Sequence, residues 1–174
     1  PTYDLTQPDQ LTRFCREAFA GALSQRQQEL VRQALEAGTW SNADSRDEVA
    51  AMALAFHDAH RPDGGVQLEQ LFISGHSASN GIWGDSNGEL SMESVAALVE
   101  AFPTAAAGVR SVFFAACNHL HKRNVTELLG WFPGLQVAGG YSDSAPGTWT
   151  GGISHCQAWE TLYQRARGAG GDVA

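Results

Sequence analysis

The chain has 174 residues, of which 43% are hydrophobic and 17% charged, so it can bury a core and does not have a disordered composition. Its net charge of −8 argues against nucleic acid or an anionic membrane surface as the main partner, because both favour clustered Lys and Arg. No apolar run approaches the roughly 18 residues that cross a bilayer, so no membrane partner is expected.

The cysteines and the first residue bound the setting of the protein. Cys15, Cys117 and Cys156 are an odd number in a chain of this size, which is not typical of a disulfide framework. A reducing, cytoplasmic location with at least one free thiol fits best. The sequence starts at Pro1 without a methionine or a signal peptide, which is consistent with a processed or trimmed fragment of a longer protein.

The first part of the chain, residues 1–62, is predicted to be helical. Apolar residues recur at helical spacing in three segments, at 9–23, 24–38 and 45–60. The stretch RPDGG that follows contains helix breakers, so the helical pattern ends there.

The second part, residues 66–167, alternates between strand and helix. The predicted strands are 66–74, 109–117 and 135–141, and the predicted helices are 91–102, 124–132 and 154–168. The turn-rich stretch at 80–90 predicts a small hairpin or an ordered loop. This alternation predicts an α/β fold in which helices pack on a parallel sheet.

Two reactive residue types follow neighbouring strands of that predicted sheet. His76 comes after the strand that ends at Ile73, and Cys117 comes after the apolar run SVFFAA. Ligands of parallel sheets bind beyond the carboxyl ends of the strands, so we expect both side chains at one edge. The sulfur and a ring nitrogen should lie roughly 3–6 Å apart in a resting enzyme.

This pair has the chemistry of a thiol nucleophile and its base. A thiol is a poor nucleophile at its free pKa of ~8.5 and becomes a good one beside an imidazole. Attack on a carbonyl also needs donors for the developing oxyanion. The backbone N–H groups of Ser77 and Cys117 are the candidates, because strand pairing is expected to end there.

The segments LFISGHS, GELSMESVAALVEAFP and VRSVFFAACN together resemble the caspase-like cysteine peptidases, which include caspases, gingipains, clostripain, separase and the bacterial CHAT-type proteases. The resemblance covers about 67–149. It implies a three-layer sandwich, a mostly parallel sheet with helices on both faces, and a catalytic pair of His76 and Cys117. Where this family usually has glycine after the histidine, the chain has Ser77.

The resemblance also implies an activity. The expected function is that of a cysteine endopeptidase, which cleaves a protein substrate through an acyl-enzyme. No cofactor is implied, although some relatives use calcium or a partner protein as an activator. The whole chain, 1–174, is then expected to be one caspase-like domain with a helical N-terminal part and an α/β catalytic part.

The loop after the third predicted strand resembles the part of that fold that shapes the substrate pocket. Asp143 lies in this loop, in GGYSDSAPG, and is expected to favour a basic residue before the scissile bond. Gly139 and Gly140 would let a substrate side chain pass close to the backbone. The plainer interpretation is that Asp143 only caps its own turn.

Three alternatives remain open. GHSAS is close to the nucleophile elbow of α/β-hydrolases, with Ser77 as the nucleophile and Asp143 and His155 following in the order Ser, Asp, His. A degenerate peptidase-like module could instead act by binding a partner without catalysis. A metal site at His119 and His121 is a weaker candidate, and no metal is expected because no second ligand cluster has convincing spacing.

Overall fold

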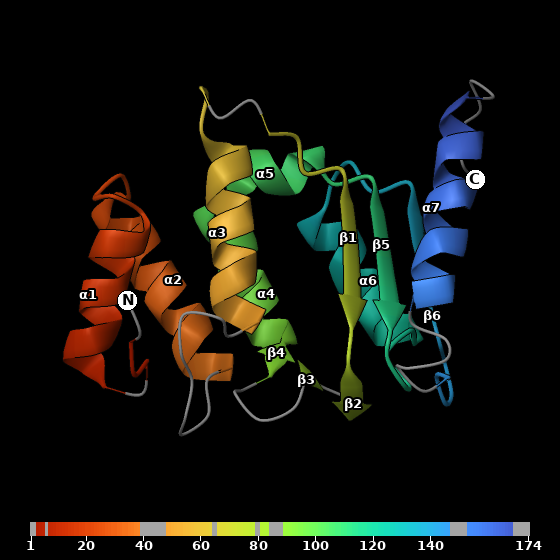
Figure 1. Cartoon of the computed structure of the whole chain (residues 1–174), viewed down its shortest axis with the longest axis horizontal. Coiled ribbons are helices and arrows are strands. Elements are labelled where there is room, and N and C mark those ends of the chain that lie inside the picture. The colour runs from red at the N-terminus through yellow and green to blue at the C-terminus, as the bar shows by residue number, and fades with distance from the viewer. Residues whose placement is uncertain are drawn as a thin grey trace. The chain divides into compact units, whose positions relative to one another are not determined.

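The computed structural model describes residues 3–5, 7–38, 48–63, 66–78, 81–83, 89–146 and 153–168 (Figure 1). In these ranges the helices are α1 (Pro8–Ala18), α2 (Gln25–Gly38), α3 (Glu48–His60), α4 (Met92–Ala101), α5 (Pro103–Gly108), α6 (Lys122–Trp131) and α7 (Ile153–Gly168). The strands are β1 (Gln70–Ser74), β2 (His76–Ala78), β3 (Gly81–Trp83), β4 (Leu90–Ser91), β5 (Ser111–Ala115) and β6 (Val137–Gly140).

The helical N-terminal region predicted from the sequence is confirmed, with one boundary corrected. Helix α1 ends at Ala18 and not at Leu23. Ala20 and Gly21 have φ angles of 49° and 69°, in the left-handed region, and the Gly21 N–H donates to the carbonyl of Arg16 at 2.9 Å. A left-handed residue closed by this bond is a common way for a helix to end, and glycine adopts it without strain.

A parallel sheet forms from the three predicted strands, in the order β1-β5-β6. Ser74 of β1 lies opposite Ala115 of β5, and Phe114 of β5 lies opposite Gly140 of β6. The predicted mixed α/β fold with a parallel sheet is therefore confirmed. The observed strands are shorter than the predicted ones, at four or five residues each.

Two features of the described chain were not predicted. Strand β2 of the small antiparallel sheet β2-β3-β4 is one of them, whereas β3 and β4 fall on the stretch predicted as a small hairpin or an ordered loop. The turn residues 84–88 of that stretch lie outside the described ranges. Helix α5 follows α4 directly, in a stretch for which no helix was predicted. It begins at Pro103, and proline is favoured in the first turn of a new helix, where no intrahelical N–H is required.

The chain divides into two compact units. The helical unit comprises Pro1–Leu68 and Trp83–Ala106, and the sheet unit comprises Glu69–Ile82 and Ala107–Ala174. The single-domain organisation expected from the sequence stays a prediction.

The helical unit is built around packed aromatic and aliphatic side chains. Phe14 and Phe19 meet edge to face with ring centroids 5.9 Å apart, and Phe19 stacks on Phe102 at 6.5 Å. The Ser94 hydroxyl donates to the carbonyl of Ala34 at 2.8 Å and so links α4 to α2. Ser91 caps α4, since its hydroxyl accepts the Ser94 N–H at 2.9 Å.

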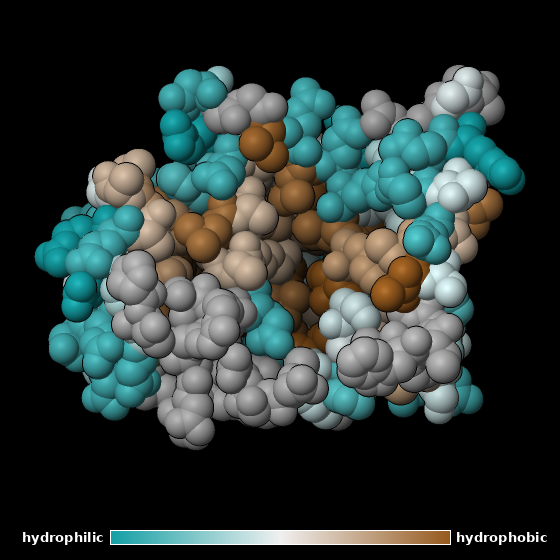
Figure 2. Space-filling model, in the orientation of Figure 1, coloured by the Kyte–Doolittle hydropathy of each residue, from teal (hydrophilic) through white to brown (hydrophobic). Residues whose placement is uncertain are grey.

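In the sheet unit, the two faces of β5 carry different side chains. On one face Phe113 stacks on Phe72 of β1 at 5.3 Å and packs on Trp159 of α7 at 4.7 Å. Val112 and Phe114 point to the other face and are buried. Helix α6 lies behind the strands in Figure 1. Figure 2 shows apolar residues at the surface over β1 and β5. Phe72 on β1 and Phe113 on β5 are both half-buried.

Among the described residues, no helix is long and apolar enough to cross a membrane.

Candidate functional site

The register of β1 and β5 brings His76 and Cys117 to the same edge of the sheet. Ser74 pairs with Ala115, and one further backbone bond follows, from the Gly75 N–H to the carbonyl of Ala115 at 3.3 Å. His76 and Cys117 each lie two residues beyond the Ser74–Ala115 pair. Neighbouring strands are about 4.8 Å apart, so both residues leave the sheet close together. We call this end of the strands the carboxyl edge.

The third strand brings Asp143 to the same edge. Phe114 pairs with Gly140, so the register places Asp143 at the level of Cys117. Backbone bonds hold the two loops together: the Asn118 N–H donates to the carbonyl of Asp143 at 2.9 Å, and the His119 N–H donates to that of Tyr141 at 3.0 Å. All three residues expected at the site therefore start from one edge of one sheet.

Cys117 lies in a turn that exposes it in part. Asn118 has a φ of 52°, so the chain turns sharply directly after the cysteine. The Cys117 thiol is free and half-buried, and its Sγ accepts a hydrogen bond from the Ala145 N–H at 3.2 Å. This bond fixes the position of the sulfur beside the loop that carries Asp143.

His76 is exposed, and it begins β2 rather than a loop. The expectation that strand pairing ends before Ser77 is wrong, because His76–Ala78 joins the small antiparallel sheet. A strand on each side of Gly75 gives the histidine backbone a fixed direction.

The contact between Ser77 and His119 was not predicted from the sequence. The Ser77 Oγ and the His119 Nδ1 share a hydrogen bond at 3.0 Å. Burial, with a smaller contribution from the nearby His121, lowers the pKa of His119 to about 4. The His119 imidazole is therefore neutral near pH 7. The only signal in the sequence was the position of His119, two residues after the candidate nucleophile.

Asp143 is exposed, and its carboxylate Oδ1 accepts the backbone N–H of Ser144 at 2.8 Å. This bond is the self-capping contact that the plainer interpretation of the sequence gives. The role of Asp143 in a substrate pocket stays a prediction.

Other residues of the protein occupy the space beside the two glycines that precede this loop. A Cβ on Gly139 would lie 2.7 Å from side-chain atoms of Phe113 and Trp159, and one on Gly140 would lie 2.9 Å from the carbonyl oxygen of Phe114. The expectation that these glycines leave room for a substrate side chain is wrong. They allow α7 and the β5 backbone to pack closely on β6.

The residues of the serine-hydrolase alternative have different partners from those that a triad would need. Ser77 bonds to His119, and the ring nitrogen of His155 bonds to the Tyr141 hydroxyl. The Asp143 carboxylate bonds to its own turn.

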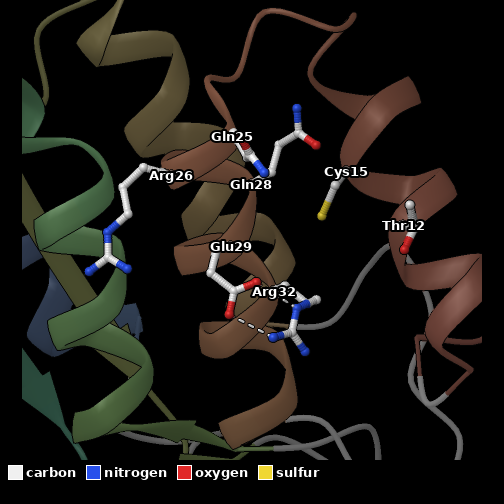
Figure 3. A pocket seen from close by; sticks show the side chains of 7 residues that line it. All are labelled: Thr12, Cys15, Gln25, Arg26, Gln28, Glu29 and Arg32. Atoms are coloured by element: carbon white, nitrogen blue, oxygen red, sulfur yellow. Dashed lines mark hydrogen bonds and ion pairs between the residues drawn. The ribbon is translucent and has the colours of Figure 1, made fainter.

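Another thiol lies beside a cavity of about 500 Å³ in the helical unit, as Figure 3 shows. Cys15 projects from α1 toward α2, and burial raises its pKa to about 11. Arg32, on the cavity wall, bonds to Glu29 at 2.7 Å, and Arg26 bonds to Glu100 at 2.5 Å. Carboxylates thus engage both guanidinium groups, and the thiol stays protonated at neutral pH.

In the part of the chain that the structure describes, no three His, Cys, Asp or Glu side chains are grouped to hold a metal ion, and this applies to His119 and His121.

No protein-family model matches the chain, and no curated protein or solved structure is significantly similar to it.

Proposed function

We propose that the chain is a cysteine endopeptidase domain with a caspase-like, three-layer α/β sandwich. The observation that carries the proposal is the parallel register of β1 and β5, which starts His76 and Cys117 from one level of the carboxyl edge. Reactive residues of open α/β sheets gather at this edge. The packing of α7 on one face of the sheet, with α6 behind the strands, supports the layered fold.

In the proposed reaction, the Cys117 thiol gives its proton to His76, and the resulting thiolate attacks the scissile carbonyl carbon of a protein substrate. A C–S bond forms as the carbonyl π electrons move to the oxygen. When the C–N bond then breaks, the leaving amine takes a proton from His76, and an acyl-enzyme remains. A water molecule loses a proton to His76, attacks the acyl carbon, and releases Cys117 as the thiolate.

The charge that develops on the substrate oxygen needs donors that are already in place. We assign this role to the backbone N–H of Cys117, which belongs to the carboxyl edge, because Ser77 is part of the paired strand β2. Asp143, at the level of Cys117, would favour Arg or Lys before the scissile bond. No cofactor enters any step, and an activating partner protein or domain remains part of the proposal.

The state of the three cysteines bears on the cellular compartment that we propose for the protein. Cys15, Cys117 and Cys156 are all free, which supports a reducing, cytoplasmic setting.

One contact favours a second candidate, a serine hydrolase that uses Ser77. The Ser77 hydroxyl lies 3.0 Å from an imidazole nitrogen, as a serine nucleophile requires. Burial, however, lowers the pKa of His119 to about 4, which makes it a poor general base at neutral pH. The cysteine is therefore the better nucleophile on this edge.

An electrophilic thiol probe that carries a peptide tests the proposal. We expect labelling and peptide cleavage in the wild type, and neither in Cys117→Ala. Cys15→Ala and Cys156→Ala are the matched controls, and both should keep the labelled band. Cleavage that survives Cys117→Ala but not Ser77→Ala would favour the serine candidate. Binding of the peptide without cleavage in any form would favour a non-catalytic module.

A crystal structure of the resting protein tests the geometry. We expect Cys117 Sγ and a His76 ring nitrogen roughly 3–6 Å apart. If the sulfur and the ring nitrogen are too far apart for a single substrate group to contact both, a shared active site is excluded.

A further inference from the structure

Ser77 and His119 join the two loops of the proposed catalytic pair. Ser77 is covalently next to His76, and His119 lies two residues after Cys117. Their side chains share a hydrogen bond at 3.0 Å across 42 positions of sequence. This bond therefore connects the backbone beside the proposed base to the backbone beside the proposed nucleophile.

The His119 end of this bond is held firmly. The ring is 1% exposed and packs on Phe114 with centroids 4.6 Å apart. The His119 N–H donates to the carbonyl of Tyr141 at 3.0 Å, and its own carbonyl accepts the Asn124 side-chain amide at 2.9 Å. These three contacts of the ring and the backbone hold the imidazole in place independently of its bond to Ser77.

The imidazole is also suited to an uncharged contact. Burial keeps it neutral near pH 7, and His121 is the titratable group that acts on it. The carbonyls and rings around it carry no charge. A neutral ring bonded to a hydroxyl keeps its geometry across the pH range in which a cysteine peptidase would work.

We propose that Ser77 and His119 are a positioning pair that sets the orientation of His76 toward Cys117. The inference rests on the proposed function, and it assigns a purpose to the serine that stands where the family usually has glycine. In this proposal the two side chains act without touching the substrate. It acts by tying β2 to the turn after β5, and a misplacement of about 1 Å in a reacting group can cost roughly 100-fold in rate.

The test is the pH profile of Cys117 alkylation by iodoacetamide, together with kcat and KM for a peptide substrate. In Ser77→Ala we expect the pH profile of alkylation to move to higher pH, because a misplaced imidazole no longer helps to form the thiolate. We expect kcat to fall about tenfold with KM unchanged, as the loss of one neutral hydrogen bond implies. Ser77→Thr keeps the hydroxyl and should restore both.

Further variants separate positioning from stability. Thr126→Ala removes an exposed hydroxyl on α6 that bonds to Lys122, and it should leave the profile unchanged. His119→Asn places an amide near the Nδ1 position and should retain much of the activity, whereas His119→Leu should match Ser77→Ala. The double variant Ser77→Ala/His119→Leu should be no slower than either single variant, because both remove the same bond.

The outcomes are distinct. If folded Ser77→Ala keeps the wild-type midpoint and kcat while His76→Ala changes both, the positioning pair is wrong and the proposed peptidase stands. If His76→Ala itself changes neither, the proposed function fails and the inference fails with it. If Ser77→Ala does not fold, the comparison of His119→Asn with His119→Leu decides in the same way.

Discussion

Two thiols of this protein lie in opposite chemical settings. Cys15, on a helix of the helical unit, is buried beside a cavity whose arginines are already bonded to carboxylates, and its pKa is raised to about 11. Cys117 lies where a parallel strand ends, half-buried, with a backbone N–H on its sulfur. The comparison teaches that a cavity alone does not make a cysteine reactive. The end of a parallel strand places a thiol at the edge where ligands of such sheets bind, and at Cys117 a backbone N–H also reaches the sulfur.

The largest effect should come from the proposed base. His76→Ala should lower kcat/KM by about 10²–10⁴-fold, the usual contribution of a general acid and base. His60→Ala, in α3 of the helical unit, removes a half-buried histidine and should leave the rate unchanged. Steady-state kinetics on a fluorogenic peptide measure both, and equal rates for His76→Ala and wild type would remove His76 from the site.

Acid should weaken the sheet unit through His119. Its pKa is about 4 in the fold and ~6.5 in the unfolded chain. The unfolded chain therefore binds a proton that the folded chain excludes. The stabilisation is present above pH ~6.5 and is lost as the pH falls toward 4, by on the order of 3 kcal/mol.

Urea unfolding at pH 7, 5 and 4, followed by tryptophan fluorescence, measures this loss. The same series on His119→Asn corrects for the carboxylates that also titrate there. A wild-type stability that falls no faster than that of His119→Asn would contradict the buried neutral imidazole.

A methyl group at Gly139 should destabilise the sheet unit. The new Cβ would lie 2.7 Å from Phe113 and Trp159, and overpacking of this kind costs about 1–3 kcal/mol. Gly130 on α6 has nothing within 4 Å of its Cβ position, so Gly130→Ala should be neutral or stabilise by up to ~1 kcal/mol. Thermal unfolding compares the two. If Gly139→Ala is as stable as the wild type but cleaves peptides poorly, Gly139 would again be a candidate for the substrate pocket.

The smallest effect concerns substrate choice. If Asp143 faces the residue before the scissile bond, Asp143→Ala should reduce a preference for Arg over Leu by about tenfold, or ~1.4 kcal/mol. Peptides that differ only at this position measure the preference. An Arg preference that survives the substitution, or that is missing in the wild type, would leave Asp143 as a turn residue bonded to Ser144.

The strand and helix order could be predicted because it depends on local patterns. The run SVFFAA is apolar on both faces, as a buried parallel strand must be, and the helices show one apolar face each. The position of His76 and Cys117 at one edge followed from that order alone, because parallel neighbours end on the same side.

The rest depends on register and packing, which no local pattern contains. The bond between Ser77 and His119 requires β1 and β5 to pair with Ser74 opposite Ala115. The closeness of Trp159 to Gly139 requires α7 to pack on that face of the sheet. The short strand at His76–Ala78 continues the pairing beyond a bend at Gly75, whereas pairing was expected to end at Ser77.

The most direct measurement of the central claim is the relative rate at which iodoacetamide modifies the three cysteines of the folded wild type near pH 7.5, followed by mass spectrometry. The account predicts that Cys117 is modified well before Cys156 and that Cys15, with its pKa of about 11, is last. Modification of Cys117 no faster than Cys15 or Cys156 would contradict a reactive thiol at the carboxyl edge.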